Sequence, residues 1–201
     1  MNYLAHLYLA KTNRDSLTGN LMGDFCQGLD IKQLPLAVQL GIHNHRSIDR
    51  FTDSHPKVRA LKSCLPPQLQ RFSGIISDVV FDHFLALQWQ QFSDKNFLEF
   101  RQHSYQKLAQ GYPLMPEKMQ IMVERMISQD WLSGYQDFAN VDRALQGIGR
   151  RMRFANPLDA AIAPVQARYE LYRASFECFF PQLIAHVQRQ NIEGEDEGDE
   201  S

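Results

Sequence analysis

Apolar residues recur at spacings of three and four along almost the whole chain, and this periodicity constrains the fold more than any other feature. Such spacing places apolar side chains on one face of an α-helix. No stretch shows the alternation of apolar and polar residues, bounded by hairpin turns, that is typical of a β-strand. The sequence therefore predicts an all-α protein, a compact single-domain bundle of about eight helices.

Prolines, glycines and capping residues divide this pattern into separate helices. The expected ranges are roughly 16–28, 35–51, 58–65, 68–92, 97–108, 116–127, 141–152 and 164–190. Pro181 falls inside the last range. Because proline cannot donate a backbone hydrogen bond, we expect it to kink or divide that helix.

Length and composition indicate one globular domain followed by an acidic tail. The 201 residues are 44% hydrophobic, which is enough for a single sizeable core. The last ten residues hold six of the 23 acidic side chains and none of the 21 basic ones, so residues 1–191 carry a net charge of +4. We expect residues 1–191 to form the domain and residues 192–201 to form a disordered tail.

The sequence lacks signals for secretion, membrane insertion or nucleic-acid binding. No apolar run approaches the roughly 20 residues that span a bilayer, and residues 1–10 lack the basic flank of a signal peptide. Three widely spaced cysteines, Cys26, Cys64 and Cys178, fit neither a disulfide framework nor a zinc-ligand pair. No nucleic-acid module or glycine-rich phosphate loop is present. We expect a cytoplasmic protein that binds neither membrane nor nucleic acid.

An apolar helix expected around residues 72–86 (FSGIISDVVFDHFLA) contains charged side chains. Asp78 and Asp82 lie one turn apart, and His83 points about 100° further around the axis. Burying an ionised carboxylate that has no partner costs on the order of several kcal/mol or more, because the charge loses its hydration. An ion pair or a helix cap would explain them structurally, and a metal ion would explain them functionally.

The first part of the chain favours the functional explanation. Four of the seven histidines lie in the first 55 residues, among several aspartates. The residues concerned are His6, Asp24, His43, His45, Asp49, Asp53 and His55. Nitrogen and oxygen ligands without thiolates suit manganese, magnesium, iron or zinc. We infer that several of these residues bind a divalent metal, which suits phosphoester hydrolysis.

Arginines suggest where an anionic substrate would bind. Arg46 and Arg50 share a helix face beside His45 and Asp49, and we assign them to phosphate binding. The densest basic segment contains Arg143, Arg150, Arg151 and Arg153, and it suits an acidic macromolecule. For both groups a solvated helix surface is the plain alternative.

Four stretches together resemble the bacterial acyl carrier protein phosphodiesterase family, also called acyl carrier protein hydrolase. They are residues 1–10 (MNYLAHLYLA), 19–25 (GNLMGDF), 41–56 (GIHNHRSIDRFTDSHP) and 78–86 (DVVFDHFLA). The resemblance implies hydrolysis of 4′-phosphopantetheine from holo-acyl carrier protein to give the apo-protein. It also implies a fold similar to the metal-dependent HD phosphohydrolases and a divalent cation, typically manganese. The chain differs from the HD class in having Asp82 and His83 in reversed order.

Matched motif by motif, the resemblance implies two sets of site residues. The catalytic set is His6, Asp53 and His55. The metal ligands are Asp24, His45, Asp49, Asp78, Asp82 and His83. Because acyl carrier proteins are acidic, the arginines of residues 143–153 then become the expected docking surface.

Two other functions would also explain parts of the sequence. A metal-dependent phosphohydrolase of a small nucleotide would share the His and Asp residues but would have less need for a basic docking surface. A non-enzymatic helical module that binds carrier proteins would keep the basic surface and tolerate the loss of Asp24, Asp78 or Asp82.

Overall fold

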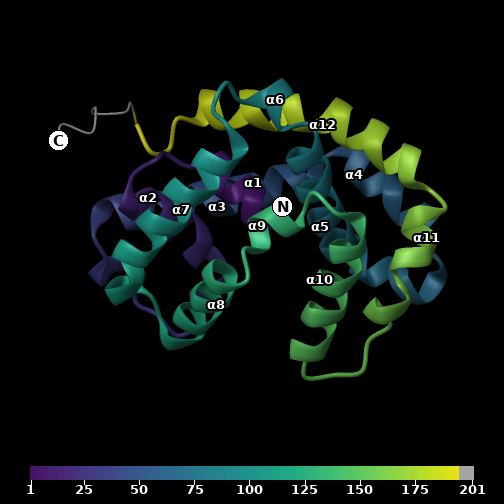
Figure 1. Ribbon diagram of the computed structural model, residues 1–201, viewed down its shortest axis with the longest axis horizontal. Helices are drawn as coiled ribbons and strands as arrows, with labels where there is room; N and C mark the ends of the chain where they lie inside the picture. Colours follow the sequence, from purple (N-terminus) through teal and green to yellow (C-terminus); the bar gives the residue numbers. More distant parts are fainter. Residues whose placement is uncertain (195–201) are drawn as a thin grey trace.

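The computed structural model describes residues 1–194, and the regular structure in that range is helical throughout, as predicted (Figure 1). The α-helices are α1 (Tyr3–Tyr8), α2 (Arg14–Met22), α3 (Leu36–Ser54), α4 (Pro56–Leu61), α5 (Ser73–Leu87), α6 (Trp89–Phe92), α7 (Phe97–Gly111), α8 (Glu117–Ser128), α9 (Trp131–Gly134), α10 (Phe138–Arg151), α11 (Ile162–Gln166) and α12 (Tyr169–Gln190). Short 3-10 helices join them at Gly23–Phe25, Ile31–Gln33, Lys62–Cys64, Pro67–Phe72, Tyr112–Leu114 and Leu158–Ala160.

The described residues thus form twelve α-helices rather than the expected eight, because several short helices gave no periodic signal. The range 68–92, expected as one helix, is divided into a 3-10 helix, α5 and α6. The last helix, α12, is not divided at Pro181. Pro181 and Glu177, whose carbonyl oxygen lacks a donor there, are both exposed, so water can satisfy that oxygen.

The core is built around α5, which is buried on nearly all sides. Phe81 and Phe84 are fully buried against Phe176 of α12, with ring centroids 5.7 and 5.9 Å apart. Burial of each such side chain stabilises the fold by roughly 1.5–3 kcal/mol. Although α5 is apolar, no helix among residues 1–194 combines the length and the apolar character needed to cross a membrane.

The first helices cross closely and thereby fix the region around α3. Gly19 of α2 and Gly41 of α3 face each other, and a Cβ atom at Gly19 would lie 2.3 Å from the carbonyl oxygen of Val38. Only glycine permits this approach. The C-terminal end of α2 consequently lies against the middle of α3, while α1 packs on both α2 and α5.

The first residues of the expected tail contact the domain. The carboxylate of Glu193 accepts hydrogen bonds from the Ser16 hydroxyl (2.5 Å) and from the amide groups of Asn20 and Asn44 (both 3.3 Å). These contacts join the chain after α12 to α2 and α3. The rest of the expected tail, residues 195–201, lies outside the described residues.

Candidate functional site

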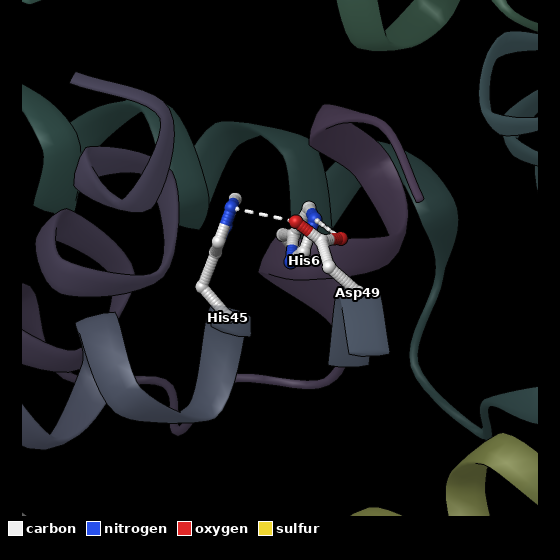
Figure 2. Close-up of side chains that lie close together, drawn as sticks. All are labelled: His6, His45 and Asp49. Carbon is white, nitrogen blue, oxygen red and sulfur yellow. Dashed lines mark ion pairs between the residues drawn. The ribbon is translucent and has the colours of Figure 1, made fainter. Parts of the chain in front are cut away.

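Three side chains that the sequence singled out meet at one point. His45 and Asp49 lie one turn apart on α3, and His6 approaches them from α1 (Figure 2). His45 Nε2 is 3.0 Å from Asp49 Oδ2, and His6 Nε2 is 3.2 Å from Asp49 Oδ1. Asp24 adds a second carboxylate, with its Oδ1 atom 3.4 Å from His45 Nε2. We call His6, Asp24, His45 and Asp49 the His/Asp cluster.

The imidazole of His45 is fixed by the end of α2. Its Nδ1–H donates to the carbonyl oxygen of Asn20 at 2.7 Å, so Nε2 faces the two carboxylates. Although burial opposes the charged form, hydrogen bonds to Asp24 and Asp49 raise the pKa of His45 to about 9. At Asp49 burial acts in the opposite direction, but the hydrogen bonds from His45 and His6 and the charge of the Met1 amine outweigh it and hold the pKa of Asp49 far below the usual range.

His6 is the neutral member of a stacked imidazole pair. Its ring lies 3.9 Å from that of His45, centroid to centroid, at an angle of 18°. Burial, followed by the charge of His45, lowers the pKa of His6 to about 4. Its Nδ1 atom is buried and has no hydrogen-bond partner among the described residues, while Nε2 lies 3.1 Å from the carbonyl oxygen of Met1.

The α-amino group of Met1 supplies a cation that sequence reasoning missed. It lies 2.9 Å from Asp78 Oδ1 and 3.3 Å from Asp49 Oδ1. Despite the opposing effect of burial, these carboxylates raise the pKa of the amine to about 11. Asp78 therefore lies beside the cluster, as its predicted role requires, but its near partner is this amine.

Asp82, predicted as a metal ligand, lies outside the group of potential ligand atoms and contacts the backbone of α1 instead. Its Oδ2 atom accepts from the backbone N–H of Leu4 at 2.7 Å, and its Oδ1 atom accepts from that of Ala5 at 3.1 Å. Both donors belong to the first turn of α1, whose own N-cap residue, Asn2, makes no capping hydrogen bond. Asp82 is thus the cap of α1 and positions the helix that carries His6.

His83, also predicted as a metal ligand, likewise lies outside this group of potential ligand atoms. Its Nδ1 atom is 2.7 Å from the carbonyl oxygen of Tyr135, and its Nε2 atom is 2.9 Å from the hydroxyl of Tyr169. Both ring nitrogens are therefore engaged in joining α5 to the segment around α9 and to α12. Burial lowers its pKa, so His83 is a neutral core residue.

The two remaining predicted catalytic residues lie at the end of α3. Asp53 follows Asp49 by one turn and is exposed. Burial raises the pKa of Asp78, and the negative charge of Asp53 acts in the same direction. His55 faces away from this group: its Nδ1 atom accepts from the backbone N–H of Lys57 (3.3 Å) and caps α4. The structure therefore places Asp53, but not His55, where it can serve the cluster.

The two arginines assigned to phosphate share a face of α3 but have different neighbours. Arg46 lies beside the Cys26 thiol, where its charge opposes the rise in the pKa of that thiol caused by burial. Cys26 is only two residues from Asp24, so Arg46 is close to the edge of the cluster. Arg50 is exposed. Burial is the main cause that lowers the pKa of His186 of α12, and the charge of Arg50 lowers it further. Arg46 thus has a neighbour close in sequence to the cluster, whereas Arg50 has one on α12, and the phosphate-binding role of both stays a prediction.

The arginines assigned to a partner are exposed on and after α10. Arg143, Arg150 and Arg151 line one cavity, whereas Arg153 is not among its lining residues. The aromatic side chains that share this cavity, Tyr3 and Trp131 among them, were not predicted as site residues, because single aromatic residues carry no sequence signal for a site.

The fold and the cluster define an all-helical protein with a centre of imidazole and carboxylate groups, which are the general acids, bases and metal ligands of hydrolases. Residues 1–183 match the acyl carrier protein phosphodiesterase family. The chain belongs to this family, as its motifs predicted.

Relatives with this family name match the chain over nearly its full length. The acyl carrier protein phosphodiesterase of Serratia proteamaculans (strain 568) is 33% identical over 193 residues, which cover 96% of this chain and all of the relative. Those of Enterobacter sp. (strain 638) and Escherichia coli (strain K12 / DH10B) are 32% identical over the same shares. No solved structure matches the chain. The expected likeness to HD phosphohydrolases therefore stays a prediction.

Proposed function

We propose that this protein hydrolyses the phosphodiester of holo-acyl carrier protein, releasing 4′-phosphopantetheine and apo-acyl carrier protein, and that it does so in the cytoplasm with a divalent metal bound at the His/Asp cluster. The observation that carries the proposal is the convergence of His6, His45 and Asp49 in a chain of this family. Manganese is the first choice of metal, with magnesium, iron and zinc as alternatives.

The donor geometry of the cluster fits such an ion. Ligand atoms that surround a metal at about 2.0–2.2 Å lie roughly 3.0–3.5 Å apart. The separations from His45 Nε2 to Asp49 and Asp24 are 3.0 and 3.4 Å, and that from His6 Nε2 to Asp49 is 3.2 Å. The hydrogen bond from His45 Nδ1 to Asn20 is the outer contact that ligating histidines usually make. His6, Asp24, His45 and Asp49 would hold the metal.

When bound, such a metal lowers the pKa of water and polarises a phosphoryl oxygen. The protein's own residues do the rest. Asp53, exposed one turn beyond Asp49, takes a proton from the attacking water. The water oxygen forms a bond to phosphorus as the bond from phosphorus to the carrier's serine oxygen breaks; the serine oxygen takes a proton from solvent, and Asp53 returns the proton it took to solvent. Arg46 compensates phosphate charge at the edge of the cluster.

The exposed arginines of α10 suit the acidic partner. Arg143, Arg150 and Arg151 lie on the wall of one cavity and give this face positive charge. Opposite charges on the two proteins would speed their encounter and orient the carrier. We assign these three arginines to docking of the holo-acyl carrier protein.

Intact-mass spectrometry of holo-acyl carrier protein tests the reaction. We expect the carrier to lose the mass of one phosphopantetheine with manganese present and to keep it with excess chelator. No loss with any of the four metals would refute the reaction, and turnover of free nucleotides instead would support a small-nucleotide phosphohydrolase. Loss that persists in chelator would refute the metal.

A pair of aspartate variants tests the site. Asp49→Asn should lower the rate by about 10- to 100-fold or more, because it removes the negative charge that faces both imidazoles and replaces one of the two oxygens that contact them with an amide nitrogen. Asp159→Asn, an equal change at an exposed residue outside the cluster, is the matched control and should leave the rate unchanged. Equal rates in both variants would contradict the assignment of the cluster.

A further inference from the structure

A cavity of about 530 Å³ lies between the N-terminal residues, α9 and α10. Its walls include Asn2 and Tyr3 on one side and Arg143, Gly147 and Arg151 on the other. This volume falls within the range of about 300–1,000 Å³ that is typical of small-molecule sites. The N-terminus, which forms part of this wall, lies in the middle of the molecule beside α9 and α5 (Figure 1).

The cavity begins next to the His/Asp cluster. Asn2 and Tyr3 directly follow Met1, whose amino group lies 3.3 Å from Asp49. Successive Cα atoms are about 3.8 Å apart, so this wall starts within two residues of the cluster. Burial raises the pKa of the Tyr3 phenol, and the charges of Arg151 on the opposite wall and of Asp24 in the cluster act on it in opposite directions. Residues 1–3 of the chain thus join the cluster to the wall of the cavity.

The walls combine apolar surface with unused amide atoms. Tyr3 and Trp131 stack with ring centroids 6.2 Å apart, and a Cβ atom added at Gly147 would meet no atom within 4 Å. Asn2 and Asn140 each donate one hydrogen bond from their side-chain nitrogen, to the Tyr135 hydroxyl and to the Gly134 carbonyl oxygen.

Several amide atoms on these walls remain open. The side-chain oxygens of Asn2 and Asn140 have no hydrogen-bond partner among residues 1–194, and neither has the side-chain nitrogen of Gln129. The cavity thus offers both acceptors and a donor beside aromatic rings, which suits a flexible chain that contains amide groups.

The charge of the cavity favours an anionic molecule. Three arginines line it, and Asp130 is the single acidic residue among the described lining residues. Asp130 is already engaged by Arg101 and by the Tyr105 hydroxyl, which donates to it at 2.8 Å. The free charge on the walls is therefore positive.

We propose that this cavity binds the pantetheine arm of holo-acyl carrier protein, with the phosphate at the His/Asp cluster and the arginines of α10 facing the acidic carrier. The arm contains two amide groups, a dimethyl-substituted carbon and a thiol, so it matches the open amide atoms and the aromatic wall. This assignment rests on the proposed function, and it adds the site that recognises the arm.

Filling the cavity from α10 tests the assignment. Gly147→Leu places a side chain in the open space, and leucine favours a helix more than glycine does. Ala144→Leu, three residues earlier on the same wall, fills the cavity from a second position. Gly74→Leu is the matched control, because a Cβ atom at Gly74 of α5 also meets nothing within 4 Å and Gly74 does not line the cavity.

Calorimetric titration with free 4′-phosphopantetheine is the measurement, together with thermal unfolding of each variant. We expect the wild type and Gly74→Leu to bind 4′-phosphopantetheine equally. Gly147→Leu and Ala144→Leu should raise Kd by at least about tenfold, which corresponds to a loss of about 1.4 kcal/mol of binding free energy. Equal affinity in all four proteins, or no binding by the wild type, would overturn the assignment.

This binding measurement does not depend on turnover, so the two proposals can fail separately. A wild type that binds 4′-phosphopantetheine in the cavity but never releases it from the carrier would support the arm site and refute the reaction. A wild type that hydrolyses holo-acyl carrier protein, with KM unchanged in both cavity variants, would support the reaction and overturn the arm site.

Discussion

Replacing Gly23 with alanine should disable the His/Asp cluster without unfolding the protein. Gly23 lies directly against the imidazole of His45: a Cβ atom there would be 2.1 Å from Cδ2, 2.2 Å from Cγ and 2.6 Å from Nε2. Ordinary contacts begin at 3.4 Å, so the ring must move by about 1 Å or more. It cannot do so and keep its hydrogen bond to Asn20 together with its contacts to Asp24 and Asp49.

The size of the effect follows from this displacement. A misplacement of about 1 Å in a catalytic centre costs roughly 100-fold in rate, or about 2.7 kcal/mol at about 1.36 kcal/mol per tenfold. Disturbing a ligand or its support lowers metal affinity by about 10- to 100-fold. The backbone of Gly23 is in the right-handed helical region (φ −48°, ψ −39°), so alanine adds no backbone strain. Stability should therefore change much less than activity does.

Three measurements on purified Gly23→Ala check this reasoning. The rate of phosphopantetheine release should fall by about 100-fold, manganese affinity in calorimetry should fall by at least about tenfold, and the thermal midpoint should stay within a few degrees of the wild type. Gly74→Ala, where the added methyl group meets open space, should match the wild type in all three. Unchanged release and unchanged manganese affinity in Gly23→Ala would refute the role of His45.

Three further predictions concern the groups around the cluster. Because His45 has a raised pKa of about 9 and a metal must displace its proton, manganese affinity measured by calorimetry should rise by up to about tenfold per pH unit as pH rises toward 9; a flat profile would exclude His45 as a ligand. Asp82→Ala leaves two buried N–H groups of α1 unpaired and should lower the free energy of unfolding in urea by about 1–3 kcal/mol, and an unchanged midpoint would contradict its capping role. Glu193→Ala should cost about 1 kcal/mol in the same assay, and a loss no larger than that of the exposed control Glu170→Ala would show that its contacts to α2 and α3 add nothing.

The helical fold was predictable because its main elements are long and periodic. The helices around residues 35–51 and 97–108 follow apolar spacing and capping residues that are local in sequence, and α3 and α7 confirm them. The helix α1 was not predictable. It has six residues, and the carboxylate that caps it comes from Asp82, some 77 residues later in the chain. A helix this short depends on such tertiary contacts, which leave no local pattern.

The candidate site was predictable in part for the same reason. His45 and Asp49 share a face of one helix, so their spacing alone places them together, and the structure does so. The spacing of Asp78, Asp82 and His83 was equally regular but did not reveal their partners. Those partners are the Met1 amine, two backbone N–H groups of α1, and the oxygens of Tyr135 and Tyr169.

A buried carboxylate shows that positive charge or hydrogen-bond donors must be near, but it does not show which kind. Asp82 is satisfied by peptide N–H groups, and Asp78 is paired with the amine of Met1, so neither needs a metal to be stable in the fold. Asp49 differs, because it faces two imidazoles with a second carboxylate, that of Asp24, next to them. Asp24, Asp49 and Asp78 together face one protonated imidazole and the Met1 amine, so the group retains negative charge that a divalent cation would compensate. This difference in charge and partners is why we propose the His/Asp cluster, rather than Asp82, as the place where a divalent metal binds.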